Sequence, residues 1–287
     1  MPLSVVRISR REALKRFLEE DIGRGDVTTL AIVPPDQKAT GHFIAKAPLV
    51  LAGIELAIEA LTLLDQGVVV ENRHRDGDEL CEGDRAASLR GQARALLTGE
   101  RVATNLLQRL CGIATLTRRF VEAVRGTDAK ILDTRKTTPG LRVFEKYAVT
   151  VGGGINHRFG LDDAILIKDN HIRLAGGIRA ATETAREHES RSHRFEVEVT
   201  TLDELQEALR YDLDAVLLDN MTPEMVRQAV ACVRAHERGK KIVVEASGGM
   251  TLDNVRAFAE AGADWISIGA LTHAAPAVDM SFKIYPA

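Results

Sequence analysis

The sequence predicts an α/β protein, namely an incomplete, open α/β barrel of about six or seven parallel strands that follows an α+β N-terminal domain. From Ala129 onward, short apolar runs alternate strictly with helical patterns, which is typical of a parallel sheet covered by helices. Before that point the pattern mixes extended runs with long helices, and 287 residues exceed the roughly 100–200 of one domain. We therefore expect an N-terminal domain over 1–112, a barrel over 113–273 and a tail, 274–287, that rejoins the N-terminal domain.

The N-terminal part is expected to contain both helices and strands. Ile54, Ala57, Ile58 and Leu61 recur at helical spacing, and the long helical stretch is expected to break near Gly112. The tail VDMSFKIYP alternates like a strand that returns to the N-terminal sheet. The expected helices are Arg10–Glu20, Gly53–Asp65 and Ala93–Val124, and the expected strands are Thr40–Ala47, Gly67–Arg73 and the end of Glu79–Arg90.

Six apolar runs define the expected barrel strands: KILDT, AILIKD, FEVEVT, AVLLDN, IVVEAS and WISIGA. Capping residues mark two of the helix starts, Thr201 with Glu204 and Thr222 with Pro223. Six strands are fewer than the eight of a closed barrel of about 250 residues, so we expect an open barrel, with a doubly wound sheet as the alternative. The helical patterns between the strands are Gly177–Glu189, Leu202–Arg210, Pro223–Ala235 and Leu252–Ala261.

Composition excludes several classes of protein. Lys and Arg number 38 against 41 Asp and Glu, so nonspecific binding of nucleic acid through net charge is not expected. No apolar run reaches the roughly 18 residues of a membrane span, and the start lacks the features of a signal peptide. Cys81, Cys111 and Cys232 are odd in number and far apart, which suits a reducing compartment. We expect a cytoplasmic protein with no nucleic-acid or membrane partner.

Every predicted barrel strand ends in polar or glycine-rich residues. In parallel α/β folds the carboxyl ends of the strands gather at one face, and that face holds the functional site. Side chains scattered along the barrel should therefore converge there. The strand-end residues are Asp133–Lys136, Lys168–Asn170, Glu196 with Glu198, Asp219–Asn220, Glu245–Gly249 and Gly269–Ala270.

Charges of both signs are expected at this face. Several cations in one mouth repel one another, so an anionic ligand with carboxylate or phosphate groups would compensate them. Glu198 and Asp219 are acidic, and carboxylates beside a phosphate site commonly hold Mg²⁺ together with water and ligand oxygens. The alternative is that these charges form structural ion pairs. The cationic candidates are Arg135, Lys136, His157, Arg158 and Lys168.

Glycine-rich turns after the late strands indicate a phosphate site. EASGGMTLDN runs from a strand through a glycine pair into an expected helix, so that backbone amides and the helix N-terminus could face a phosphate. SIGALTH follows the next strand and places His273 nearby. Gly152–Gly154 precede His157, where three glycines favour a close approach by a ligand or by backbone. The plainer alternatives are an αL turn at the first place and a helix C-cap at the second.

Longer motifs point to a known family. They are EDIGRGDVTT, GERVATNLLQRLCGIAT, DTRKTTPGLR, EKYAVTVGGGINHRFGLDDAILIKDNHI, EVEV, LLDNM, EASGG and ISIGALTH. Together they resemble quinolinate phosphoribosyltransferase, also called nicotinate-nucleotide pyrophosphorylase (carboxylating), from about residue 20 to the C-terminus. The resemblance implies an incomplete α/β barrel and a dimer or larger assembly. It also implies transfer of phosphoribose from phosphoribosyl pyrophosphate to quinolinate, giving nicotinate mononucleotide, pyrophosphate and CO2 for NAD synthesis.

The same resemblance implies roles for individual residues. The catalytic candidates are Lys136, Lys168, Glu198 and Asp219, and the last two would also hold Mg²⁺, directly or through water. Arg101 corresponds to an arginine that the neighbouring subunit lends to the pocket. Lys46 departs from the family, which usually has an arginine there. The substrate-binding candidates are Arg101, Thr134, Arg135, Lys136, His157, Arg158, Lys168, Glu198, Asp219, Ser247, Gly248, Gly249 and Gly269.

Three other functions stay open at this point. Lys168 stands where a barrel aldolase keeps its Schiff-base lysine, and burial could lower the pKa of such an amine. The molybdenum-transport-associated pyrophosphorylase-like group is a relative within the superfamily, and Lys168 in LIKDNH argues against it. The third is a phosphosugar-binding or regulatory barrel without turnover. Six polar strand ends of both charge signs are more than a binding protein requires.

Overall fold

The computed structural model describes residues 9–188 and 193–287, and these form two compact units. Unit 1 comprises the chain up to Thr115 together with Ala275–Ala287, and unit 2 comprises Leu116–Ala274. The boundary falls within helix α4 (Ala93–Ala123). Each unit has its own sheet, and the fold class is the α/β architecture with an α+β N-terminal part that the sequence predicts.

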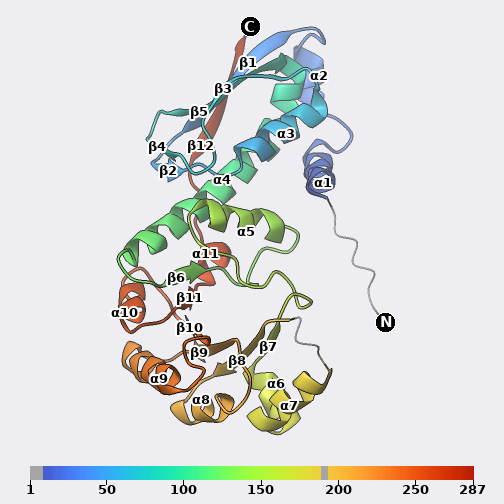
Figure 1. Cartoon of the computed structure of the whole chain (residues 1–287). Coiled ribbons are helices and arrows are strands. Elements are labelled where there is room, and N and C mark those ends of the chain that lie inside the picture. The colour runs from blue at the N-terminus through green and yellow to red at the C-terminus, as the bar shows by residue number, and fades with distance from the viewer. Residues whose placement is uncertain (1–8, 189–192) are drawn as a thin grey trace. The chain divides into compact units, whose positions relative to one another are not determined.

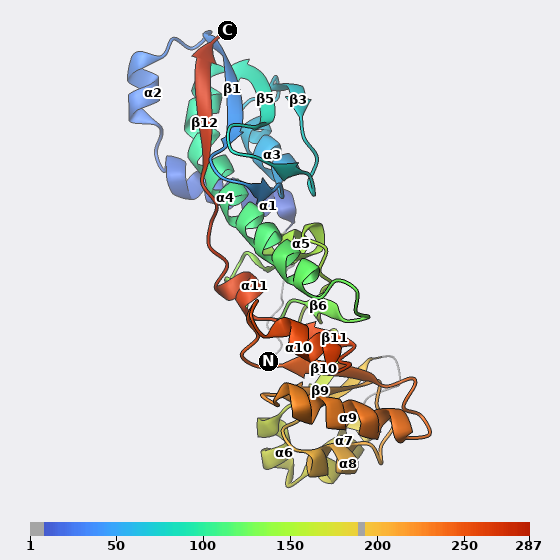
Figure 2. The ribbon, with the colours of Figure 1, turned by 90° about the vertical axis from the view of Figure 1, so that its left-hand side faces the viewer.

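Unit 1 is built on a four-stranded antiparallel sheet in the order β12-β1-β5-β3. The tail forms β12, which lies beside β1 (Figure 2). The two strands pair antiparallel, and the register places Phe282 opposite Phe43. The expected return of the tail to the N-terminal sheet is therefore confirmed. The elements are α1 (Arg10–Ile22), α2 (Val27–Ile32), β1 (Lys38–Ala45), β2 (Leu49–Val50), α3 (Ile54–Leu64), β3 (Val69–Arg73), β4 (Glu79–Leu80), β5 (Arg85–Gln92) and β12 (Met280–Pro286).

The core of unit 1 lies between this sheet and the helices α1, α3 and the first half of α4. Alternate residues of β1 are buried, including Ala39, Phe43 and Ala45, because side chains of a strand point in turn to opposite faces. Helix α3 contributes Ile54, Leu61 and their neighbours at helical spacing. The apolar residues that recur at helical spacing in the sequence are thus the residues that α3 buries in the core.

One sequence expectation for unit 1 is wrong. Helix α4 continues through Gly112 without a break. A Cβ atom at Gly112 would lie 2.0 Å from the carbonyl oxygen of Pro276, so this glycine permits a close approach of backbone rather than a break. The end of the motif EDIGRGDVTT forms the start of helix α2, whose N-cap Asp26 accepts a hydrogen bond from the Thr29 amide at 3.0 Å.

Unit 2 contains a six-stranded parallel sheet in the order β6-β11-β10-β9-β8-β7, with α8, α9 and α10 along one side (Figure 1). Among the described residues, the edge strands β6 and β7 do not pair with each other, so the expected open barrel is confirmed. The elements are β6 (Lys130–Leu132), α5 (Arg142–Val151), β7 (Ile165–Ile167), α6 (Asp169–Ala175), α7 (Ile178–His188), β8 (Phe195–Val199), α8 (Leu202–Ala208), β9 (Ala215–Asp219), α9 (Pro223–Ala235), β10 (Val243–Ser247), α10 (Val255–Glu260), β11 (Trp265–Ser267) and α11 (Ala270–His273).

The helices of unit 2 differ from expectation mainly at their ends. Helix α9 begins and ends as predicted, with Thr222 as its N-cap. Helix α10 begins at Val255 rather than Leu252, because residues 252–254 form a turn. Helix α7 begins at Ile178, and Glu189, the expected end of that helix, lies outside the described residues. No helix in the described part of the chain is both long and apolar enough to cross a bilayer.

Strand β8 shows how the sheet directs its charged residues. All five of its residues are buried, and alternate side chains point to opposite faces. The Arg186 guanidinium of α7 lies 4.0 Å from the centre of the Phe195 ring, which marks that face of the strand as the helix side. Glu196 and Glu198 therefore point to the opposite, inner face of the sheet.

Candidate active site

A cavity of about 730 Å³ lies at the carboxyl ends of the strands of unit 2. It collects residues from the segments that follow all six strands, as expected for a parallel α/β fold. Apolar side chains of Leu166, Leu217 and Ile268 contribute to its wall. The polar lining residues include Thr134, Arg135, Lys136, His157, Arg158, Lys168, Glu198, Asp219, Asn220, Glu245, Ser247, Gly248, Gly249, Thr251, Ser267, Gly269 and His273.

The structure brings together every predicted site residue except Arg101. Arg101 lies on the part of α4 that belongs to unit 1, where it is exposed. Lys46 belongs to unit 1 as well. Sequence reasoning gave no role to Asn220 or Ser267, although each is a small polar residue at the end of a predicted strand, and that position is the signal that could have found them.

Lys168 and Glu198 form an ion pair at the cavity wall. The Lys168 Nζ lies 2.9 Å from Glu198 Oε2. The Glu198 side chain is only 9% exposed and the Lys168 side chain 44%. The alternative of structural ion pairing therefore holds for these two residues, and both remain at the cavity wall.

Among the described residues, Arg135 and Arg158 form no ion pair of this kind, and Glu196 and Asp163 act on Arg158 only at longer range. Burial and the neighbouring Arg135 lower the pKa of Arg158, which is the effect expected for close positive charges in a partly desolvated place. Arg158 donates from Nη1 to the carbonyl oxygen of Ala164 at 2.9 Å. The buried Nε of Arg135 has no hydrogen-bond partner within the described chain. The two groups thus form a cationic region that favours an anionic ligand.

The opposite part of the cavity combines carboxylates with a glycine turn. Ser247 lies opposite Asp219 in the sheet register, and Asp219 Oδ2 accepts from Asn220 Nδ2 at 2.7 Å. Gly248 has φ +102° and Gly249 φ +59°, and a Cβ at Gly248 would lie 2.2 Å from Asn220 Oδ1. The turn therefore needs glycine for both its conformation and its packing.

The expected helix N-terminus behind this turn is absent. Helix α10 begins at Val255, several residues beyond Gly249, so its first amides do not directly follow the glycine pair. The prediction of a helix-dipole contribution at Gly248 and Gly249 is wrong for that reason. Two local features could still receive a phosphate. They are the amides of the Gly248–Gly249 turn and the backbone at Gly269, where a Cβ atom would lie 2.9 Å from Lys136 Cδ.

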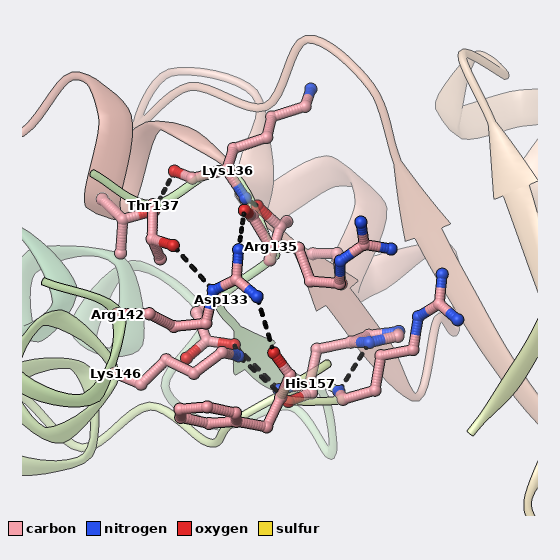
Figure 3. Close-up of polar contacts among 12 residues, drawn as sticks. Asp133, Arg135, Lys136, Thr137, Arg142, Lys146 and His157 are labelled. Atoms are coloured by element: carbon pink, nitrogen blue, oxygen red, sulfur yellow. Dashed lines mark hydrogen bonds and ion pairs between the residues drawn. The ribbon is translucent and has the colours of Figure 1, made fainter. Parts of the chain in front are cut away.

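A buried ion pair holds the segment that carries His157. The Lys146 Nζ donates to Asp133 Oδ1 and, at 3.0 Å, to the carbonyl oxygen of His157. Asp133 Oδ1 also accepts from the His157 amide at 2.9 Å, as Figure 3 shows. The Lys146 and Asp133 side chains are 2% and 0% exposed, and burial raises the pKa of Asp133 and lowers that of Lys146.

The imidazole of His157 is also held by the chain itself. Its Nδ1 accepts from the Arg158 amide at 2.8 Å, and its Nε2 lies 3.4 and 3.3 Å from carboxylate oxygens of Glu196 and Glu245. Burial lowers the pKa of His157, but the two carboxylates outweigh burial and raise it to about 9. A backbone N–H can only donate, so Nδ1 is the acceptor in the Arg158 contact, and the Nε2 edge of the ring faces the two carboxylates.

Two groups of residues could be considered for a metal ion. His157, Glu196 and Glu245 have ligand atoms within 4.8 Å of one another, but a metal there would have to displace the proton that the two carboxylates stabilise on His157. Glu198 and Asp219 offer hard carboxylate oxygens at the cavity wall. Such donors fit Mg²⁺, which keeps several waters and takes further oxygens from a bound phosphate.

Comparison with known proteins identifies the family. The family models described as quinolinate phosphoribosyl transferase, N-terminal domain and C-terminal domain, match residues 26–111 and 113–283. The chain belongs to the quinolinate phosphoribosyltransferase family. The resemblance inferred from the motifs is confirmed.

Individual relatives of the family match nearly the whole chain. A probable nicotinate-nucleotide pyrophosphorylase [carboxylating] of Bacillus subtilis is 44% identical over 274 residues, covering 96% of this chain and 93% of the relative. The nicotinate-nucleotide pyrophosphorylase [carboxylating] of Mycobacterium leprae is 41% identical over 280 residues, covering 96% of each. The crystal structure of NadC from Streptococcus pyogenes is similar with a TM-score of 0.92, 39% identity and full coverage of both chains.

Proposed function

We propose that the cavity of unit 2 is the active site in which this chain joins quinolinate to phosphoribosyl pyrophosphate. The chain is a pentosyltransferase of its family, whose reaction releases pyrophosphate and CO2 and gives nicotinate mononucleotide in NAD biosynthesis. The observation that carries the assignment of the site is the division of charge within one cavity. Arg135 and Arg158, which form no ion pair within the described part of the chain, line the same cavity as the carboxylates Glu198 and Asp219.

The cationic region suits the two adjacent carboxylates of quinolinate. Guanidinium groups form paired hydrogen bonds with carboxylates, and ammonium groups add point charges. Arg135, Arg158 and Lys136 would hold the pyridine dicarboxylate, while Lys168 reaches the cavity from the side of Glu198. Because His157 directs both ring nitrogens to the chain itself, its contribution to binding would be to hold Arg158 in place.

The acidic part of the cavity suits the sugar phosphate. The amides of the Gly248–Gly249 turn and the residues near Gly269 would receive the 5′-phosphate, with Ser247 beside them. Glu198 and Asp219 would face the ribose. Glu198 and Asp219 would hold Mg²⁺, directly or through water, and the ion would supply positive charge to the pyrophosphate.

The charges account for both chemical steps. Departure of pyrophosphate leaves positive charge on the ribose, which the carboxylates of Glu198 and Asp219 stabilise, while the lysines stabilise the leaving group. The ring nitrogen of quinolinate then attacks C1 of the ribose. The carboxylate next to the cationic ring nitrogen then leaves as CO2, the electron pair stays on the ring carbon where the positive nitrogen stabilises it, and a proton from solvent completes nicotinate mononucleotide. Partial exclusion of water around Arg135 and Arg158 favours the loss of CO2.

Arg101 is proposed to act from a neighbouring subunit. It lies outside the cavity-forming unit and is exposed, so a second copy of the chain could present it to the pocket. This requires at least a homodimer. A cytoplasmic location is proposed because the three cysteines form no disulfide, which suits a reducing compartment.

A direct assay tests the proposed function. Purified protein is supplied with carboxyl-labelled quinolinate, phosphoribosyl pyrophosphate and Mg²⁺, and released CO2 and nicotinate mononucleotide are measured. We expect Lys136→Ala and Arg158→Ala to lose most turnover because each removes a cation from the dicarboxylate site. Arg227→Ala, on the exposed surface of α9, is the matched control. Wild-type kinetics in both site variants would contradict the assignment of the pocket.

A further inference from the structure

Arg142 makes contacts that the proposed mechanism does not use. It is the first residue of α5 and follows the Pro139-Gly140 turn in the motif DTRKTTPGLR. Its Nε donates to Thr137 Oγ1 at 2.9 Å, its Nη1 to the carbonyl oxygen of Phe159 at 3.0 Å, and its Nη2 to that of Arg135 at 3.3 Å. Figure 3 shows Arg142 between these groups.

These contacts connect the two segments that carry the cations of the cavity. The first arm, Arg135–Lys136, follows β6, and the second arm, His157–Arg158, follows α5. Arg142 holds the carbonyl oxygen of Arg135 in the first arm and that of Phe159, the residue directly after the second arm. Arg142 itself is not among the residues that line the cavity.

The chemistry of the contacts requires an arginine. A guanidinium group presents five N–H donors in a rigid plane, so one side chain can serve three acceptors in different directions. A lysine has one donor atom on a flexible stem and cannot span the same three oxygens. None of the ion pairs in the described part of the chain involves Arg142. Its guanidinium group instead donates to the Thr137 hydroxyl and to the carbonyl oxygens of Phe159 and Arg135.

The inner side of the second arm is fixed independently of Arg142. Lys146 and Asp133 hold both main-chain groups of His157, and Glu145 accepts from the amide and hydroxyl of Thr138 at 3.0 and 2.8 Å. Arg142 bonds to the backbone of both arms, while the Thr272 hydroxyl holds only the carbonyl oxygen of Lys136, at 2.8 Å, and Asp163 accepts only from the Phe159 amide, at 2.7 Å. Loss of Arg142 should therefore change the spacing of the arms while leaving the buried base intact.

We propose that Arg142 is a positioning residue that sets the distance between the two cationic arms and thereby the preference for a ligand with two adjacent carboxylates. A single carboxylate can be gripped by one arm, whereas a dicarboxylate must meet both at once. The inference rests on the proposed function, because it takes the arms to be the quinolinate site.

Two variants separate position from charge. Arg142→Lys keeps the positive charge but loses the planar fork, and Arg142→Met loses both. Steady-state kinetics gives KM for quinolinate and KM for phosphoribosyl pyrophosphate separately. Calorimetry without turnover measures the affinity for benzene-1,2-dicarboxylate and for nicotinate, which has one carboxylate. Arg227→Met, whose parent residue pairs with Glu224 on α9, controls for the loss of an arginine elsewhere on the same unit.

We expect both Arg142 variants to raise KM for quinolinate by about tenfold, roughly the size of one hydrogen bond to a charged group. KM for phosphoribosyl pyrophosphate should change less than about twofold, and the affinity for benzene-1,2-dicarboxylate should fall more than that for nicotinate. The Arg227→Met control should match the wild type.

Several results would overturn the proposal. If Arg142→Lys matches the wild type while Arg142→Met does not, only the charge matters. If both substrates or both carboxylate ligands weaken equally, Arg142 has a general structural role. Should Arg142→Met fail to fold, Arg142→Lys and Thr137→Val, which removes one acceptor, carry the same test. Absence of turnover by the wild type would refute the proposed function instead, and the calorimetric comparison would still decide the role of Arg142.

Discussion

Asp133 and Lys146 lie buried beneath the cavity, and both contact the main chain of His157. Neither residue lines the cavity, yet they hold the segment that presents Arg158. Removing one partner of a buried pair leaves an uncompensated charge, whereas replacing both by apolar groups can be much less costly. At the scale of the residue, the site therefore depends on charges that a ligand does not touch.

We expect Lys146→Met to lower the free energy of unfolding by about 3–5 kcal/mol because Asp133 would remain buried without its partner. The double variant Asp133→Leu with Lys146→Met should lose less than the sum of the two single variants. Urea unfolding followed by circular dichroism measures both values. The exposed pair Arg227 and Glu224 provides the control, with an expected cost of about 0–1 kcal/mol. Simple additivity of the two buried substitutions would contradict the coupling.

At the scale of the element, the short helix α2 depends on the hydrogen bonds of its N-cap for stability. Helix α2 has six residues, too few to be stable by propensity alone. Asp26 accepts from the Thr29 amide at 3.0 Å and from the Thr98 hydroxyl at 3.1 Å. These contacts tie the beginning of α2 to helix α4 within unit 1.

Hydrogen bonding to the Thr29 side chain and amide lowers the pKa of Asp26, which gives the cap a defined pH dependence. A group with a depressed folded-state pKa stabilises the protein above its unfolded pKa, about 3.9 for aspartate, and loses that contribution as the pH falls through the folded value. We expect Asp26→Ala to cost about 1 kcal/mol between pH 5 and 8. The difference from the wild type should shrink below about pH 4.

Urea unfolding at several pH values tests this expectation, with Asp26→Asn as the control. Asparagine is also a good N-cap but does not titrate, so its difference from Asp26→Ala should not depend on pH. A wild-type advantage that persists unchanged under acidic conditions would show that the ionised carboxylate is not what caps α2.

At the scale of the whole molecule, we propose that a second chain contributes Arg101 to the site. The cavity is formed within unit 2, whereas Arg101 lies on unit 1 and is exposed. In a two-fold symmetric dimer each surface is used twice, so two chains could exchange this arginine and complete two sites.

Mixing two inactive variants tests the exchange. Arg101→Ala and Arg158→Ala should each lose most turnover alone. When they are dissociated, mixed and reassociated, half of the dimers pair one chain of each kind, and one of the two sites in such a dimer has both arginines. We expect recovery of about a quarter of the wild-type activity by this statistical argument. Activity that stays at the level of the separate variants would show that Arg101 does not act across an interface.

Much of the fold could be predicted because it is encoded in local patterns. The six barrel strands were visible as short apolar runs, and Thr222 with Pro223 marked the start of α9. The alternation in FEVEV placed Glu196 and Glu198 on one face of β8. These patterns depend on the period of a strand or helix and on capping chemistry, which act over only a few residues.

The candidate site was predictable for a related reason. Strand-end positions are fixed once the strands of a parallel sheet are known, so residues such as Lys136 and Asp219 could be assigned to one face. The roles of Arg142, Lys146 and Glu245 could not, because each depends on which segments meet in the folded chain. An arginine at a helix start or a glutamate in a strand has no local signal that names its partner.

By itself the sequence determined the alternation of strands and helices, the family and the set of charged residues at the strand ends. Only the tertiary structure decided that α4 runs through Gly112, that α10 begins beyond the glycine turn, and that His157 turns both ring nitrogens toward the chain. Periodicity and capping are short-range effects and leave a trace in neighbouring residues. Contacts between distant segments arise from packing and close backbone approach, which neighbouring residues do not record.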